Sequence, residues 1–133
     1  MMTSTRNERI RVLHVDDEPD FAELTAEFLE QEDERMVVLT AECPDDGLSI
    51  LQDREIDCVV SDYDMPDADG LWFETQVRME EPNLPFILYT AHEREELPQT
   101  IESEKPVDYM QKQCGTNQFS TLANRVADAV ESE

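Results

Sequence analysis

The sequence has few basic residues, few cysteines and no long apolar run. Its 133 residues include 10 lysines and arginines against 33 aspartates and glutamates, which leaves a formal net charge of −23. A chain this acidic repels nucleic-acid phosphates and anionic membranes, so we expect neither as a direct partner. No apolar run approaches the roughly 20 residues that a membrane-spanning helix needs. The polar residues 1–11 lack the apolar centre of a secretory signal.

The cysteines and lysines indicate the cellular environment of the protein rather than a metal site or a disulfide framework. Cys43, Cys58 and Cys114 are scattered and odd in number, which indicates neither a disulfide framework nor a metal cluster. A reducing, cytoplasmic location is the simplest interpretation. Lys105 and Lys112 are the two lysines, and the other eight basic residues are arginines. This acidic, lysine-poor composition resembles that of proteins from halophilic archaea, with an ordinary acidic protein as the alternative.

The length fits a single domain with one modest core. We expect a disordered N-terminal tail over residues 1–9, the domain over residues 10–131 and a short C-terminal end at residues 132–133.

Short apolar runs alternate with amphipathic stretches along the chain. Repeated alternation of this kind predicts an α/β fold with a parallel sheet, because parallel strands need crossover connections. The expected strands cover residues 12–15, 36–40, 58–61, 86–89 and 107–110. The expected helices begin near residues 19, 45, 71, 93 and 119, and Pro98 must start, kink or shorten the fourth.

The sequence also predicts the environment of several individual side chains. Leu24 belongs to the apolar face of the first helix, and we interpret Trp72 and Met79 as helix or core residues. His14 lies in an expected buried strand, and we predict that its side chain packs in the core. For His92, beside the fourth strand, a solvated side chain is favoured over a gating role.

Polar side chains stand where the expected strands end. The first strand stops at Asp16 and Asp17, the third at Asp62 and the fourth at Thr90, while the fifth leads to Lys112. In a parallel sheet these ends meet at one edge, where ligands bind. Three crowded carboxylates either take up protons or bind a cation. Oxygen ligands without histidine or cysteine favour a hard ion such as Mg²⁺.

The carboxylates, the hydroxyl and the ammonium at this edge together predict phosphoryl-transfer chemistry. A carboxylate such as Asp62 can act as the nucleophile in phosphoryl transfer and form an aspartyl phosphate. Mg²⁺ would offset the repulsion between that carboxylate and the incoming group. The hydroxyl of Thr90 and the ammonium of Lys112 could hold phosphoryl oxygens. The residues therefore predict metal-assisted, reversible phosphorylation of one aspartate.

Taken in order, these motifs resemble the receiver domains of two-component response regulators, of the CheY-like type. The similarity extends over about residues 10–131 and is carried by VLHVDDEP at 12–19, VVSDYDMP at 59–66 followed by Asp69-Gly70, LYTA at 88–91 and DYMQK at 108–112. The resemblance implies a flavodoxin-like (βα)5 fold, a three-layer sandwich around five parallel strands in the order 2-1-3-4-5.

The resemblance also implies roles for the acidic residues. Asp62 would be the phosphoacceptor. Asp17 would ligate Mg²⁺ or Mn²⁺ directly, and Asp16 would act mostly through water. Asp64 would contribute its backbone carbonyl to the metal.

The resemblance implies that other residues would contact the phosphoryl group and change conformation when it is present. Thr90 would supply the switch hydroxyl, and the backbone amide of Ala91 would bond the phosphoryl group beside it. Lys112 would pair with a phosphoryl oxygen. Tyr109 would be the aromatic switch that turns inward when Thr90 moves.

Two residues depart from the pattern of the family. Gln113 stands after Lys112 where the family usually has a proline with a cis bond. A cis bond before another residue costs about 2.5–4 kcal/mol, so we expect a trans bond here. Pro98 lies in a helix that usually contributes to the family's output face.

The sequence therefore favours a signalling switch over an enzyme. A histidine kinase or another phosphohistidine donor would phosphorylate Asp62, and the new charge would bias a loop and helix surface. The protein would catalyse only its own phosphotransfer and dephosphorylation. No DNA-binding segment follows the last helix, so we expect output through contact with an unknown downstream protein or through a phosphorelay. The protein could form a homodimer through the output face. The chain could also be a receiver domain of a larger sensor or hybrid kinase.

Two other functions are compatible with parts of the sequence. Asp62-Tyr63-Asp64 has the Asp-x-Asp spacing of phosphatases of the haloacid dehalogenase type, but in that family the pair follows the first strand. A pseudo-receiver that binds a partner without phosphorylation is kept open by Gln113, and the retained acids and Thr90 argue against it.

Overall fold

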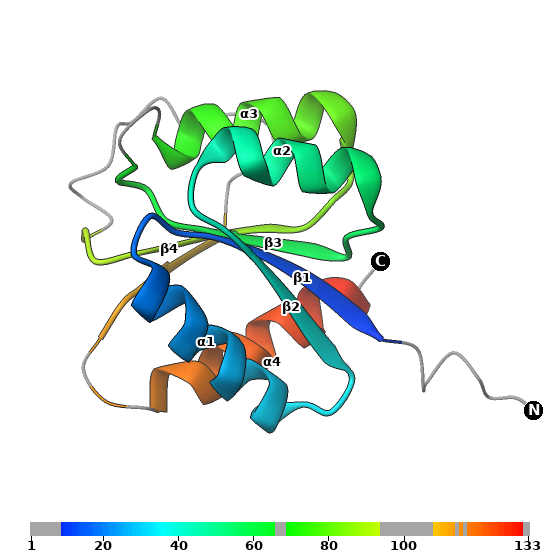
Figure 1. Cartoon of the computed structure of the whole chain (residues 1–133). Coiled ribbons are helices and arrows are strands. Elements are labelled where there is room, and N and C mark those ends of the chain that lie inside the picture. Colours follow the sequence, from blue (N-terminus) through cyan, green and yellow to red (C-terminus); the bar gives the residue numbers. More distant parts are fainter. Residues whose placement is uncertain (1–8, 66–68, 94–107, 114, 116, 132–133) are drawn as a thin grey trace, which may run out of the picture.

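The computed structural model describes residues 9–65, 69–93, 108–113, 115 and 117–131. Five parallel strands form one sheet in the order β2-β1-β3-β4-β5. Helices α2 and α3 cover one face of this sheet, and α1 and α4 cover the other (Figure 1). The predicted flavodoxin-like, three-layer fold with strand order 2-1-3-4-5 is confirmed.

The helices and strands begin and end close to the predicted positions. The strands are β1 Ile10–Val15, β2 Met36–Ala41, β3 Cys58–Ser61, β4 Phe86–Thr90 and β5 Asp108–Gln111, and the helices are α1 Pro19–Glu32, α2 Pro44–Asp53, α3 Gly70–Glu80 and α4 Asn117–Glu131. Residues 94–107, with the expected helix around Pro98 and the first residue of the expected fifth strand, lie outside the described residues. Of the described helices, none is long and apolar enough to cross a membrane.

The register of the sheet brings the strand ends together at one edge. Val15, the last residue of β1, pairs with Ala41 on β2 and with Ser61 on β3. On the other side of β3, Thr90 at the end of β4 pairs with Gln111 on β5. The residues that follow β1, β3 and β5 therefore emerge at the same edge of the sheet.

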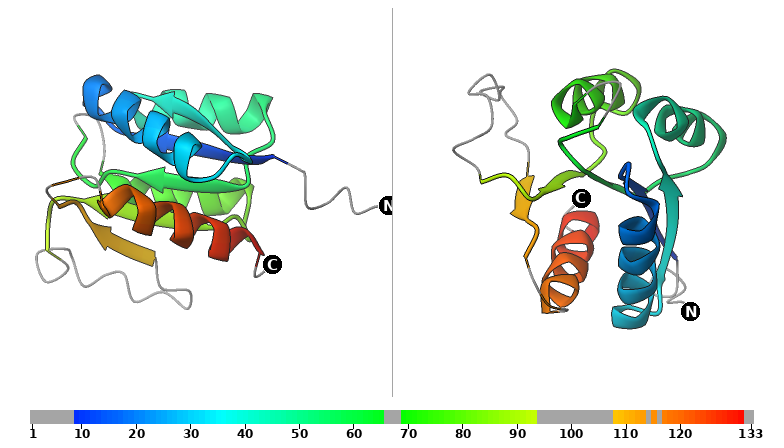
Figure 2. Two further views of the ribbon diagram at one scale, coloured as in Figure 1. Left: turned by 90° about the horizontal axis from the view of Figure 1, so that it is seen from below. Right: turned by 60° about the vertical axis from the view of Figure 1, so that its left-hand side comes forward.

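Figure 2 shows the helices on both sides of the sheet, and each face of the sheet has its own apolar core. Successive residues of a strand point to opposite faces, so β1 contributes Val12 to the core beneath α1 and α4 and Leu13 to the core beneath α2 and α3. Phe73 and Val77 anchor α3 to the second core.

Three large apolar side chains on the helices are exposed. Leu24 is 42% exposed, Trp72 is 43% exposed and Met79 is 73% exposed. Helix α1 packs through Ala22, Thr25 and Leu29, and Leu24 lies off this stripe because neighbouring helical residues point in different directions. Trp72 likewise precedes the buried Phe73 on α3 and points away from the core. The expectation that Leu24 belongs to the buried apolar face was therefore wrong, whereas Trp72 and Met79 are helix residues, one of the two placements expected for them.

Thr25 carries a buried hydroxyl whose removal should stabilise the protein. Its side chain is fully buried, and its hydroxyl has no hydrogen-bond partner among the described residues. Valine has the same shape and a similar helix propensity. We expect Thr25→Val to raise the free energy of unfolding by about 1 kcal/mol, because an unpaired buried hydroxyl costs free energy.

Urea denaturation of the two proteins measures this difference. Thr75→Val is a matched control, because that threonine is exposed on α3 and its hydroxyl donates to the Leu71 carbonyl at 3.1 Å. The control should change the free energy of unfolding by no more than about 0.5 kcal/mol. A Thr25→Val variant less stable than the parent would contradict the assignment of an unpaired hydroxyl.

Candidate functional site

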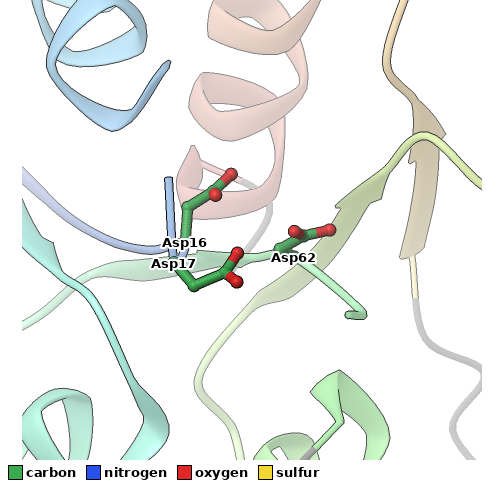
Figure 3. A group of neighbouring side chains, drawn as sticks. All are labelled: Asp16, Asp17 and Asp62. Carbon is green, nitrogen blue, oxygen red and sulfur yellow. The ribbon is translucent and has the colours of Figure 1, made fainter. Parts of the chain in front are cut away.

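Three aspartates meet at the carboxyl edge of the sheet. Asp16 and Asp17 follow β1, and Asp62 follows β3. One carboxylate oxygen from each of the three lies within 4.8 Å of the other two. Figure 3 shows the three side chains gathered beside the ends of these strands. The structure thus brings together acids that are far apart in the sequence, as the strand-end pattern predicted.

Backbone contacts hold the main chain of these acids in place. The parallel ladder continues past the strand ends, because the Asp62 amide donates to the Val15 carbonyl at 2.9 Å and the Asp16 amide donates to the Ala41 carbonyl at 3.0 Å. Gly70, the first residue of α3, packs so closely that a Cβ there would overlap the Asp62 carbonyl oxygen. The backbone of Asp62 and Tyr63, directly after β3, therefore packs closely against the start of α3.

The three carboxylates differ in their surroundings. Asp16 is fully buried, with Oδ1 accepting from the Glu18 amide at 2.9 Å and Oδ2 accepting from Lys112 Nζ at 2.9 Å. Asp62 is 6% exposed, and its Oδ1 accepts from the Tyr63 amide at 2.8 Å. Asp17 is partly exposed, and its carboxylate has no hydrogen bond within the described part of the chain. Asp17 is thus the carboxylate most open to a direct ligand.

The environment of Asp62 disfavours its charge. Burial raises the pKa of the Asp62 carboxyl above its usual value, and the nearby carboxylates of Asp16 and Asp17 add to this effect. The Lys112 ammonium and the Tyr63 amide act in the opposite direction. A divalent cation at this edge would relieve the repulsion among the acids, because an adjacent positive charge favours ionised carboxylates. All the charged donors are oxygens, which fits a hard ion.

Lys112 is the cation of the site. Its Nζ lies 2.9 Å from Asp16 Oδ2 and 3.6 Å from Asp62 Oδ2. The ammonium also lies 4.5 Å from the centre of the Phe21 ring and 5.9 Å from that of Tyr89. Both aromatic rings are contacts that the sequence did not reveal, because Phe21 fitted the apolar face of α1 and Tyr89 fitted a buried strand.

Thr90 and its neighbours complete the edge. Thr90 is 1% exposed at the end of β4, and its carbonyl accepts from the Lys112 amide at 2.7 Å. Its hydroxyl accepts from the His92 amide at 3.3 Å. The hydroxyl of the half-buried Tyr109 donates to the His92 carbonyl. The exposed Ala91 lies between them, and its carbonyl accepts from Gln111 Nε2 at 3.2 Å.

The two histidines differ from each other. His92 is half-buried rather than solvated: its Nε2 contacts the Asp64 carboxylate at 2.5 Å, and its ring meets that of Tyr63 edge-on. The favoured prediction of a solvated His92 was therefore wrong. His14 is fully buried, as predicted, and burial lowers the pKa of its imidazole to about 4 even though Asp16 lies 3.9 Å away. The His14 ring is therefore neutral near pH 7.

The connection after Lys112 has a regular backbone. Among the described residues no peptide bond is cis, so the bond between Lys112 and Gln113 is trans, as predicted. The side chain of Gln118, at the start of α4, bonds to the backbone of this connection.

Comparisons with known proteins agree with this geometry. Residues 12–124 match the family described as response regulator receiver domain. The transcriptional regulatory protein GlrR of Escherichia coli K12 is 35% identical over 81 residues, which cover 61% of this chain and 18% of that relative. The chain therefore spans less than a fifth of the length of GlrR.

Solved structures share the fold. A response regulator receiver domain protein from Clostridium thermocellum superposes with a TM-score of 0.78 at 23% identity, covering 92% of this chain and 95% of that one. The response regulator protein TrrA of Thermotoga maritima, solved in complex with Mg²⁺-BeF, has a TM-score of 0.73 at 27% identity, covering 88% of this chain and 98% of that one.

Proposed function

Since this chain belongs to the response regulator receiver domain family, we propose that Asp62 is its phosphoacceptor. Receiver domains take a phosphoryl group from histidine kinases and act in signalling through output domains. The single observation that carries the assignment to Asp62 is its position: its carboxylate lies within 4.8 Å of two further carboxylates and 3.6 Å from an ammonium, whereas both oxygens of Asp16 already accept hydrogen bonds. Asp64, by contrast, is exposed and directs its carboxylate toward His92.

The metal would be Mg²⁺ or Mn²⁺. Asp17 and Asp62 would ligate it directly, because the Asp17 carboxylate is open. Asp16 would act through water, because its two oxygens already accept hydrogen bonds from Glu18 and Lys112. Asp64 would add its backbone carbonyl. Bound there, the ion would neutralise negative charge on the phosphoryl oxygens and on the acids. The Mg²⁺-BeF complex of TrrA supports this assignment.

The residues of the chain would then carry the transfer. An Asp62 carboxylate oxygen attacks phosphorus, the new O–P bond forms, and the N–P bond of the phosphohistidine donor breaks. The Tyr63 amide keeps Asp62 oriented through Oδ1. Lys112, the Thr90 hydroxyl and the Ala91 amide would hold the transferred oxygens, where charge-assisted hydrogen bonds are strong.

The hydrogen bonds around His92 suggest how the site would signal. The Thr90 hydroxyl accepts from the His92 amide, and Tyr109 donates to the His92 carbonyl. If the Thr90 hydroxyl turned to bond a phosphoryl oxygen, it would leave the His92 amide. The loop that holds Tyr109 in its half-buried position would then be loosened. Tyr109 would turn inward, and the surface around β5 would change.

The wider role follows from the family. We propose that residues 10–131 form the receiver domain, that its donor is a histidine kinase or another phosphohistidine protein, and that it signals to a downstream protein or a phosphorelay. We further propose that it catalyses only its own phosphotransfer and dephosphorylation, that any homodimer forms through its output face, and that it works in the cytoplasm, where its scattered cysteines stay reduced. The phosphatase and pseudo-receiver alternatives are not favoured by the family match.

Treatment with acetyl phosphate tests this function. With Mg²⁺ present, intact mass spectrometry should show the addition of one phosphoryl group, and a chelator should prevent it. An unmodified mass under both conditions would argue for a pseudo-receiver. Steady hydrolysis of many phosphomonoesters would argue for a phosphatase.

We also propose an origin in a halophilic archaeon, which predicts that salt stabilises the protein. The formal charge of −23 makes the folded chain repel itself. Molar salt shortens the screening length to about 3 Å, from about 30 Å at 0.01 M. The melting temperature should therefore rise steadily as KCl increases from low to molar concentration. A melting temperature that falls over this range would contradict the halophilic assignment.

A further inference from the structure

The side chain of Gln118 uses its full hydrogen-bonding capacity. Its Oε1 accepts from the Gln113 amide at 3.1 Å and from the Tyr89 hydroxyl. Its Nε2 donates to the Gln113 carbonyl at 2.5 Å and to the Gly115 carbonyl at 2.8 Å. The side chain is 8% exposed. A reversed amide would set its oxygen against the carbonyls of Gln113 and Gly115 and its nitrogen against the Gln113 amide, so the network favours this orientation of the carboxamide.

These bonds hold the backbone next to Lys112 from both sides. On one side, the Lys112 amide donates to the Thr90 carbonyl at 2.7 Å. On the other side, Gln118 satisfies both the amide and the carbonyl of Gln113, as a peptide group of a neighbouring strand would. The carboxamide therefore pairs with the backbone two residues beyond Gln111, the last residue of β5.

Tyr89 links the same carboxamide to the ammonium group. It is fully buried on β4, its hydroxyl donates to Gln118, and its ring centre lies 5.9 Å from Lys112 Nζ. Phe21 on α1 flanks the ammonium at 4.5 Å. The ring faces attract the cation. The ammonium thus contacts Asp16 and the rings of Phe21 and Tyr89, and Gln118 on α4 is linked to it through the Tyr89 hydroxyl.

We propose that Gln118 is a positioning residue for phosphotransfer, which sets the place of the Lys112 ammonium through the Gln113 backbone and the Tyr89 hydroxyl. This inference rests on the proposed role of Lys112 at Asp62. A lysine side chain has many rotamers, and ordering it before the reaction removes an entropic cost from the transition state. Gln118 touches neither the acids nor the transferred group and acts through Lys112.

The test replaces the carboxamide while keeping its bulk. Gln118→Met should slow phosphorylation by acetyl phosphate and Mg²⁺ about tenfold, because small displacements of a catalytic group are costly in rate. The affinity for Mg²⁺, measured by nuclear magnetic resonance titration, should be kept or increased, because Asp16 and Asp17 stay in place. Gln52→Met is the matched control: Gln52 is exposed on α2 and donates to Glu80 at 3.3 Å. It should react at the parental rate.

A double-mutant cycle with Lys112→Met separates positioning from a general structural role. In the Lys112→Met background, Gln118→Met should cause no further slowing. A Gln118→Met variant that reacts at the parental rate, or that slows both backgrounds equally, would overturn the inference. If Lys112→Met alone left the rate unchanged, the proposed function of Lys112 would fail instead. If Gln118→Met did not fold, Tyr89→Phe, which removes only the hydroxyl link, would be measured in the same cycle with the same two overturning outcomes.

Discussion

Asp62→Asn should abolish phosphorylation of the protein by acetyl phosphate and Mg²⁺. The amide keeps the shape of the carboxyl and can keep accepting from the Tyr63 amide, but it is a far weaker nucleophile toward phosphorus than a carboxylate. Intact mass spectrometry should therefore show no phosphoryl adduct on the variant under conditions that modify the parent. The fold should persist, because burial and neighbouring acids disfavour the charge that the substitution removes.

Asp53→Asn is the control for this experiment. It removes one negative charge from the exposed end of α2, away from the three acids. Its adduct should form at the parental rate. A phosphoryl adduct that persists in Asp62→Asn, and that maps to another aspartate, would reject the proposed phosphoacceptor.

Lys112→Met should slow the same reaction about 100-fold, the typical effect of removing one group that stabilises developing charge. Methionine keeps much of the side-chain length and the contact with the Phe21 ring, but it removes the ammonium that lies between Asp16 and Asp62. The variant should also be less stable, because the fully buried Asp16 carboxylate loses its ionic partner. The rate is measured as adduct formation against time.

Arg54→Met provides the matched loss of a positive charge. Arg54 is exposed and follows α2, so its replacement should leave the rate unchanged. Lys112→Arg should recover part of the rate, because it restores a cation without the compact geometry of the ammonium. Equal rates for the parent and Lys112→Met would remove Lys112 from the proposed mechanism.

The acids of the site could be predicted from the sequence because they interrupt apolar runs. Val12 to Val15 and Cys58 to Ser61 are buried strands that stop directly at aspartates. The alternation of strands and helices implies a parallel sheet, and a parallel sheet places all such ends at one edge. The parallel sheet and the acidic cluster therefore follow from local patterns combined with one topological rule, whereas the strand order was implied by the resemblance to receiver domains.

The contacts that order Lys112 could not be predicted in this way. Phe21, Tyr89 and Gln118 reach the lysine or its loop from three different elements. Whether they come together depends on the position of each helix relative to the strands of the sheet. The hydrophobic periodicity of the sequence does not predict this position. The contact between His92 and Asp64 joins two loops for the same reason.

The exposed apolar residues show a related limit. Leu24, Trp72 and Met79 are apolar and helical, yet each is well exposed. Apolar identity alone does not decide burial, since a large part of any protein surface is apolar. The angle at which a helix crosses the strands determines which of its side chains face the sheet.

A structure of the protein with Mg²⁺ and beryllofluoride tests the account most directly. We expect beryllium to be bound to a carboxylate oxygen of Asp62, the Mg²⁺ ion to be ligated by Asp17 and Asp62, and Lys112 Nζ to point to a fluoride. The Thr90 hydroxyl should have left the His92 amide. A complex in which the Asp62 carboxylate stays free, or in which the ion binds away from the three aspartates, would contradict the proposed phosphoacceptor site.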